Sequence, residues 1–283
     1  MMEVVEQVRM RVQSAVRTRI AGRDFERAHS RIFQAPGPRW FTESDPIWRV
    51  HADASMFVGG IRALLLQSLH PRAMAAVSQH SGFRGDPWGR LQRTSAFLAT
   101  TTYGPIDAAE RMISAVNRIH AGIAGVTSDG LPYRADEPHL LAWVHIAELD
   151  SFLAAHDHFG ARPLVGEERD SYVAQNAEIA RRLGVVEPPT TAAALAECLA
   201  SYRPLLRMTD EARETSALLL RRPPLSGAEL AGFRTMASGA ISTLPSWARV
   251  LLELPTLPIT DRLVIRPVTR TTLRGLRWAM APA

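Results

Sequence analysis

The sequence contains a single cysteine and no lysine, so all 33 of its basic residues are arginine. One cysteine, Cys198, excludes an internal disulfide framework and is typical of a protein from the reducing cytosol. It lies in the alanine-rich stretch 192–200, which favours a small packed residue over a reactive thiol. The absence of lysine removes that side chain from every candidate site.

Long apolar runs are also absent. No segment reaches the ~18 uninterrupted apolar residues of a membrane span. The N-terminal stretch carries charges at Glu3, Glu6, Arg9 and Arg11, where a signal peptide would be apolar. These absences predict a cytoplasmic protein without a transmembrane segment.

The net charge of +5 raises nucleic acid or an anionic membrane as a binding partner. The arginines are scattered, however, and their tightest groups are the pairs Arg181-Arg182 and Arg221-Arg222. No basic patch studded with aromatic residues connects them. We therefore expect no nucleic-acid binding.

Apolar residues recur every three to four positions through most of the chain, and neither strand-like alternation nor a repeat of fixed period is found. Glycine and proline separate the helical stretches. The predicted helices cover residues 2–34 (as one or two helices), 47–79 with an end or kink at Pro71, 87–102, 139–159, 167–183, 191–200, 209–220 and 226–240, with another helix beginning near Asp107. Residues 81–87 and 125–138 are predicted loops, with Asp86 capping the helix that follows it.

The sequence thus predicts an all-α protein, one multi-helix domain of roughly ten helices over residues 1–283. Within it we expect an N-terminal helical arm at 1–44, a core at 45–240 and a Pro-rich helical C-terminal tail at 241–283. The arm would pack on the body or on the second subunit of a homodimer.

Arg90 and Thr94 share one face of the predicted helix 87–102, together with Phe97 and Thr101. One interpretation is structural, with a solvated arginine and a threonine bonded to a neighbouring carbonyl. The other is functional, because one-turn spacing lets a guanidinium and a hydroxyl point into one cavity. There they could bind a haem propionate, polarise dioxygen or orient a peroxide.

His120 and His145 both fall on apolar helical stripes, where a neutral imidazole needs a partner for its buried nitrogens. Each alone is well explained as a core histidine bonded to a carbonyl. Their place on consecutive long helices also fits a haem axial ligand, a neutral imidazole held in an apolar slot. We interpret His29, His51 and His139 as surface or capping residues.

His156 and His158 flank Asp157 at a predicted helix end, where a cation is favourable by itself, and metal binding is the weaker alternative there. Other metal and nucleotide motifs are absent. The chain has no HExxH, no paired Glu-x-x-His, no cysteine cluster, no Gly-rich phosphate loop and no Gly-x-Ser-x-Gly elbow. Zinc and di-iron sites therefore fit poorly.

Several segments, in order and spacing, resemble the family that includes MpaB-type and latex-clearing (rubber) oxygenases. They are residues 59–71 (GGIRALLLQSLHP), 80–83 (HSGF), 86–94 (DPWGRLQRT), 118–121 (RIHA) and 143–151 (WVHIAELDS). The resemblance covers about 45–160 and continues more weakly to about 240.

This resemblance implies an all-helical fold around haem b and oxidative chemistry with dioxygen, in known members the cleavage of a carbon–carbon double bond in an isoprenoid chain. It implies that His120 is the proximal iron ligand and that Arg90 and Thr94 are distal pocket residues. It also implies that His145 is a second pocket histidine or lies behind the ligand shell.

The sequence departs from the latex-clearing members at Arg93, where they carry a lysine that can approach the iron. A guanidinium stays protonated and is a poor metal ligand, so we expect Arg93 to meet a propionate or solvent. A carboxylate base preceding Arg90 would have to be Asp53 or Asp86, because no glutamate lies between Glu43 and Glu110.

Two functions follow as hypotheses. The first is a haem-b-dependent oxygenase acting on a small, largely apolar substrate with dioxygen or peroxide. The second is a non-catalytic haem or lipophilic-ligand binding protein of the same fold.

Overall fold

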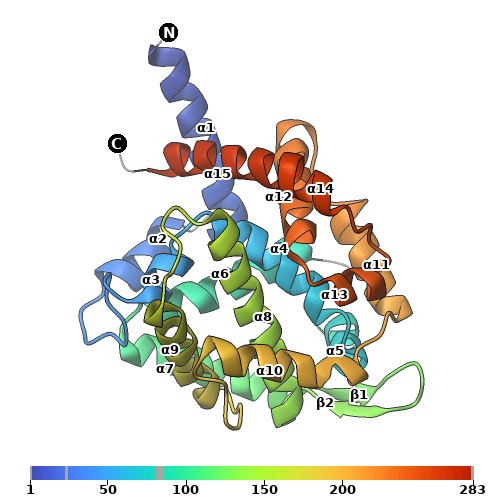
Figure 1. Ribbon diagram of the computed structural model, residues 1–283. Helices are drawn as coiled ribbons and strands as arrows, with labels where there is room; N and C mark the ends of the chain where they lie inside the picture. Colours follow the sequence, from blue (N-terminus) through green and yellow to red (C-terminus); the bar gives the residue numbers. More distant parts are fainter. Residues whose placement is uncertain (1, 23–24, 81–85, 282–283) are drawn as a thin grey trace.

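The computed structural model describes residues 2–22, 25–80 and 86–281 of the chain. It is all-α with one small hairpin (Figure 1). The N-terminal half contains α1 (Met2–Ala21), α2 (Phe25–His29), the π-helical turn η1 (Ser30–Gln34), α3 (Pro46–His51), α4 (Ser55–Gln67), α5 (Pro71–His80), α6 (Pro87–Tyr103), α7 (Ile106–Ala121), β1 (Ala124–Val126) and β2 (Pro132–Arg134). The all-α prediction is confirmed.

The second half continues with α8 (Pro138–Phe159), α9 (Glu167–Arg182), α10 (Ala192–Tyr202), the 3-10 turn η2 (Arg203–Leu205), α11 (Asp210–Leu220), α12 (Gly227–Thr243), α13 (Ser246–Leu251), α14 (Pro258–Thr260), the π-helical turn η3 (Asp261–Ile265) and α15 (Arg266–Met280). Both ends of the chain lie on one side, where α1 and α15 pack together (Figure 1). No helix in the described ranges is long and apolar enough to cross a membrane.

Helix α8 is the centre of the fold, and α4 packs along it (Figure 1). Close approach depends on Gly59, since a Cβ there would lie 2.9 Å from Phe152 Cδ1 and 3.2 Å from Phe152 Cα. Arg62 on α4 is almost fully buried and reaches Asp150 Oδ2 at 2.7 Å and Ser151 Oγ at 2.7 Å on α8. These motif residues therefore hold two central helices together.

The structure corrects three sequence expectations. The predicted helix 47–79 is interrupted before Pro71 as well, at 52–54, because the Asp53 side chain accepts the Ser55 amide and begins α4. The loop predicted at 125–138 contains the antiparallel pair β1–β2, which is too short for a period-two pattern to show. The predicted tail contains one continuous helical segment, 258–280, that packs on α12 and α1.

The predicted turn at Ser81–Gly85 lies outside the described residues, so that part of the 80–83 motif has no structural counterpart here. The cap that follows it is confirmed, since the Gly89 amide donates to Asp86 Oδ1 at 2.8 Å. The division into arm, core and tail at 1–44, 45–240 and 241–283 stays a prediction.

Candidate functional site

The α6–α7 hairpin carries the first candidate residues. The two helices pack together, and Gly104 and Pro105 form the short turn between them. Arg90 and His120 stand at nearly equal distances along the chain before and after that turn. An antiparallel hairpin therefore places them at the same level.

Arg90 is half-buried in the second turn of α6. Burial, with the nearby charge of Arg93 as a second cause, lowers the pKa of its guanidinium to about 10. It remains a cation at neutral pH, and its poor solvation favours an anionic partner.

Thr94 lies one helical turn after Arg90 and is exposed. Arg93 is also exposed, at 63% of its side chain, and its guanidinium lies 3.5 Å from Asp86 Oδ2. Arg93 thus faces solvent and the helix cap, whereas Arg90 faces the protein.

His120 lies in the last turn of α7. Its Nδ1 is buried and has no hydrogen bond to any described residue. Burial lowers the pKa of His120, and the charge of Asp136 offsets this in part. The imidazole is therefore neutral at pH 7, and the influence of Asp136 shows that the end of α7 approaches the start of α8.

His145 lies two turns into α8. Burial lowers its pKa to about 4, so this imidazole is neutral as well. Its Nε2 is buried without a hydrogen bond to the described chain. An unpaired buried nitrogen is costly unless a ligand satisfies it, and His120 and His145 share this property.

Glu148 follows His145 by one turn on the same helix. Burial raises the pKa of its carboxyl to about 7. No hydrogen bond to it is formed within the described ranges. Sequence reasoning proposed Asp53 or Asp86 as the pocket carboxylate, but Asp53 binds Arg277 and the Ser55 amide, and Asp86 caps α6. Of these three carboxyls, Glu148 is the one without a hydrogen bond to the described residues.

His145, Glu148 and Arg90 each keep some accessible surface, although burial dominates the pKa of all three. Groups that are desolvated but still partly accessible are candidates for contact with a ligand.

A buried polar network adjoins Glu148. His51 Nδ1 lies 2.8 Å from Thr102 Oγ1, and its Nε2 lies 3.3 Å from the Tyr172 hydroxyl. Burial, with His156 as a second cause, lowers the pKa of His51 to about 3. Burial raises the pKa of Tyr172, and the charge of Glu148 adds to this, which places Glu148 near the network.

The surface or capping role expected for His51 was therefore wrong. Its partners come from α6 and α9, far away in the sequence, so no local pattern shows them. For the carboxyl of Glu148, by contrast, the sequence did offer a signal, because Glu148 lies three residues after His145 on the same helical face.

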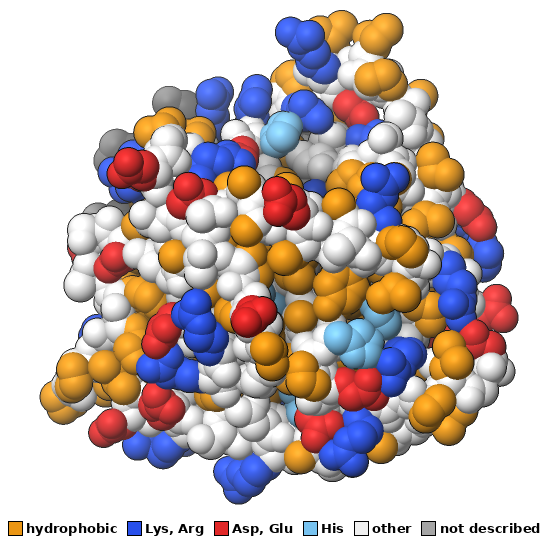
Figure 2. All heavy atoms as spheres, turned by 60° about the horizontal axis from the view of Figure 1, so that its bottom comes forward, with side chains coloured by type: hydrophobic (Ala, Val, Ile, Leu, Met, Phe, Trp, Pro, Cys, Tyr) orange, Lys and Arg blue, Asp and Glu red, His pale blue; other side chains and the backbone are white. Residues whose placement is uncertain are grey.

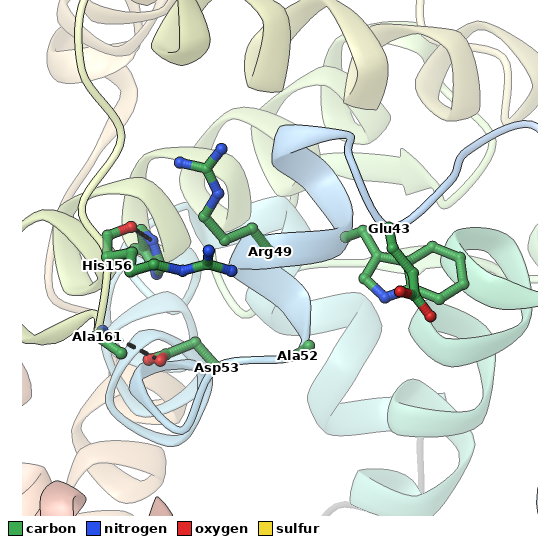
Figure 3. Close-up of a pocket in the computed structure, with 8 residues that line it drawn as sticks. Glu43, Arg49, Ala52, Asp53, His156 and Ala161 are labelled. Atoms are coloured by element: carbon green, nitrogen blue, oxygen red, sulfur yellow. Dashed lines mark hydrogen bonds between the residues drawn. The ribbon is translucent and has the colours of Figure 1, made fainter.

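A recess of about 310 Å³ is open at the surface and is lined by Glu43, Trp48, Arg49, Ala52, Asp53, His156, Ala161 and Arg162 (Figure 3). Two of its charged groups, Arg49 and Asp53, already have partners. Arg49 pairs with Glu168, and Asp53 accepts from Arg277 and from the Ala161 amide.

His156 uses both ring nitrogens, with Ser55 Oγ at 3.3 Å and the Arg162 carbonyl at 3.0 Å. The weaker alternative of metal binding at this helix end has no ligand set in the described residues, which contain no group of three His, Cys, Asp or Glu suited to a metal ion. A haem iron differs, because one imidazole suffices to hold it.

On the face in Figure 2, acidic and basic side chains are intermixed, and no continuous basic surface forms. Pale-blue histidine atoms show between apolar side chains on this face. Its charge pattern is that of an ordinary solvated surface.

Comparison with protein families gives one result that covers most of the chain. The family model described as "ER-bound oxygenase mpaB/B'/Rubber oxygenase, catalytic domain" matches residues 48–280. Searches of curated proteins and of solved structures gave no significant match.

Proposed function

Because this chain belongs to the family of the mpaB-type and rubber oxygenase catalytic domains, which matches it over residues 48–280, we propose that it is an oxygenase that binds haem b. We propose further that its substrate is small and largely apolar and that the oxidant is dioxygen or peroxide. Membership of the family supports oxygenase activity in general. The haem cofactor, the oxidant and the substrate class are what we propose beyond it.

The observation that carries the proposal is the state of His120. It is a neutral imidazole on a helix that resembles the family motif, its Nδ1 is buried and unpaired, and its Nε2 has no partner among the described residues. An imidazole in this state can bind iron without first losing a proton or another bond. His120 is thus the proposed axial ligand, and His145, with its own unpaired nitrogen, is the second pocket histidine.

Arg90 suits a haem propionate, since its half-buried guanidinium can donate paired hydrogen bonds to a carboxylate. Thr94 extends the same helix face by one turn, where its hydroxyl can orient a polar group of the oxidant or substrate. Bound haem would supply the redox chemistry that no side chain here can provide.

Glu148 is the proposed proton-handling group of the pocket. Its pKa of about 7 means that both protonation states are populated near neutrality, as a general acid or base requires. Tyr172, whose pKa the charge of Glu148 helps to raise, lies near it and is paired with His51.

The absorption spectrum of protein expressed with haem supplied tests the proposal. The wild type should show a Soret band, and His120→Ala should lose haem or change the spectrum. His158→Ala is the matched control, because His158 is also a half-buried helical histidine whose pKa burial lowers.

A His120→Ala protein with full haem content and an unchanged spectrum would refute the ligand assignment and direct the same test to His145. A colourless wild type that retains a bound lipid would instead identify the non-catalytic carrier. Thr94→Val separates function from folding, because removing an exposed hydroxyl should shift stability by less than about 0.5 kcal/mol while oxidation slows.

A further inference from the structure

The C-terminal helical segment 258–280 exposes an unusual number of apolar side chains. Ile259 is 74% exposed, Leu263 67%, Val264 51%, Val268 50% and Trp278 50%. The opposite side of the segment is buried, and Thr269, Leu273 and Ala279 pack toward the body. Two distinct faces result, of which only one is needed for the fold.

The exposed positions follow helical spacing. Val264, Val268, Thr271, Gly275 and Trp278 recur every three or four residues and therefore form one row along the outside of the helix. We call this row, together with Ile259 and Leu263, the C-terminal apolar row. It extends over most of a helix that Figure 1 shows at the edge of the molecule, beside α1.

Arginines border this row. Residues 262–283 contain five arginines and no acidic residue. Arg266 and Arg277 turn inward, to the Ser242 carbonyl and to Asp53. Arg262, Arg270 and Arg274 are exposed, although Arg270 Nε also donates to the His158 carbonyl at 2.9 Å. None of these three forms an ion pair with an acidic side chain in the described ranges.

The acidic residue of the segment, Asp261, does not reach this surface. Asp261 is buried and its Oδ2 lies 2.7 Å from Arg249 Nη1. The outward face of the segment is thus apolar and cationic, with nothing negative on it.

We propose that this face docks on the surface of an anionic lipid bilayer, with the C-terminal apolar row at the level of the acyl chains and Arg262, Arg270 and Arg274 at the headgroups. An amphipathic helix with arginines beside its apolar side and a tryptophan near one end binds membranes in this way, lying in the interface plane. Each arginine near an anionic surface adds to the attraction. The inference does not depend on haem or on the oxygenase reaction.

Charge decides between a bilayer and the other occupants. A second copy of the chain would bring two cationic faces together around the row, and like charges oppose that pairing. A nucleic acid would satisfy the arginines and leave the apolar row in water. An anionic bilayer satisfies both components at once.

Vesicle flotation with the full chain tests the proposal. Vesicles of phosphatidylcholine mixed with phosphatidylglycerol should carry the protein upward, pure phosphatidylcholine should carry little, and added salt should reduce the bound fraction. The double variant Leu263→Ser, Val268→Ser should lower partitioning by about tenfold or more. Arg262→Gln, Arg274→Gln should lower it by a similar factor and weaken its salt dependence.

The matched control is Val126→Ser, Val186→Ser, which removes two exposed valines elsewhere (53% and 66%) and should partition like the wild type. Circular dichroism of each variant, unchanged from wild type, shows that the fold is retained. Equal binding to both vesicle types, equal binding by the Leu263/Val268 variant, or a dimer in light scattering that this variant abolishes would each overturn the proposal.

Discussion

At the scale of single residues, desolvation sets the charge of the candidate site. Burial lowers the pKa of His120 and His145 and raises that of Glu148, so all three favour the neutral form. Arg90 stays charged because an arginine remains protonated even with a pKa of about 10. The candidate residues therefore comprise one fixed cation and groups that are neutral or close to titration.

The first prediction concerns Glu148→Gln. The folded pKa of Glu148, about 7, lies above its unfolded value of 4.5, so the unfolded state loses the proton first as pH rises. Stability from this group therefore falls between about pH 4.5 and 7, by at most about 3 kcal/mol. Urea unfolding should show the variant gaining stability relative to wild type across this window.

The control is Glu197→Gln, which changes an exposed carboxylate and should differ from wild type by the same small amount at pH 5 and pH 8. A Glu148→Gln difference that does not grow with pH would show that this carboxyl titrates normally.

The second prediction concerns Arg93 and belongs with the haem proposal. A protonated guanidinium has no lone pair to give to iron, and Arg93 is exposed beside Asp86. The ferric protein should therefore bind imidazole or cyanide readily. Arg93→Lys should shift toward a six-coordinate, slower-binding form at alkaline pH, where the amine is neutral. Soret titration measures both.

A wild-type spectrum that is already six-coordinate and low-spin, with a nitrogen ligand, would contradict this second prediction. It would indicate that a second histidine reaches the iron, and His145→Ala would then be the variant that opens the sixth position.

At the scale of the helices, a buried polar link joins α4 to α8. Arg62 is 2% exposed and contacts Asp150 and Ser151, while Gly59, three residues earlier, permits the close approach to Phe152. Both features lie in segments that resemble the family motifs. Their role in this structure is to place α8, and with it His145 and Glu148.

The third prediction is that Arg62→Met strongly destabilises the protein. Removing one member of a buried ion pair leaves the other uncompensated, at a cost of about 3–5 kcal/mol. The matched control is Arg213→Met, which breaks the exposed pair with Glu253 and should cost less than about 1 kcal/mol. Urea unfolding measures the loss in unfolding free energy of each variant. Equal small losses would contradict the prediction and would mean that water solvates Asp150 once Arg62 is removed.

At the scale of the whole molecule, α15 is tied to the centre of the fold. Arg277 binds Asp53 through two hydrogen bonds, at 2.9 and 2.7 Å, and also donates to the Phe159 carbonyl at 2.5 Å. Asp53 stands at the start of α4, and Phe159 ends α8. One side chain near the C-terminus thus joins both central helices.

The fourth prediction follows from this link. Burial raises the pKa of Asp53, but its bonds to Arg277 and Ser55 outweigh that effect and lower it below 3.8. Stability from this group is therefore present above the unfolded pKa and is lost as pH falls through the folded one. Arg277→Gln should cost about 2–3 kcal/mol at neutral pH and flatten the acid-unfolding profile.

Hydrogen exchange gives the second measurement for Arg277→Gln, since amides of α15 should lose protection before those of α8 do. Uniform loss of protection along the chain, with the acid profile unchanged, would show that Arg277 is not what holds α15.

Local patterns predicted most of the helices because a helix start or end depends on neighbours within one turn. Asp86 caps α6, Pro71 begins α5, and the turn at Gly104 and Pro105 separates α6 from α7, all as sequence indicates. The hairpin β1–β2 was missed because three-residue strands carry too few positions to show a period.

The sequence by itself determined the all-α class and the family motifs, since both depend on residues that lie within a few positions of one another. Only the tertiary structure decided which side chains are deprived of water. Glu148 has a raised pKa, and His51 contacts Thr102 and Tyr172, because distant helices pack around them. Desolvation and pairing depend on the whole surroundings of a group, and no local window contains those surroundings.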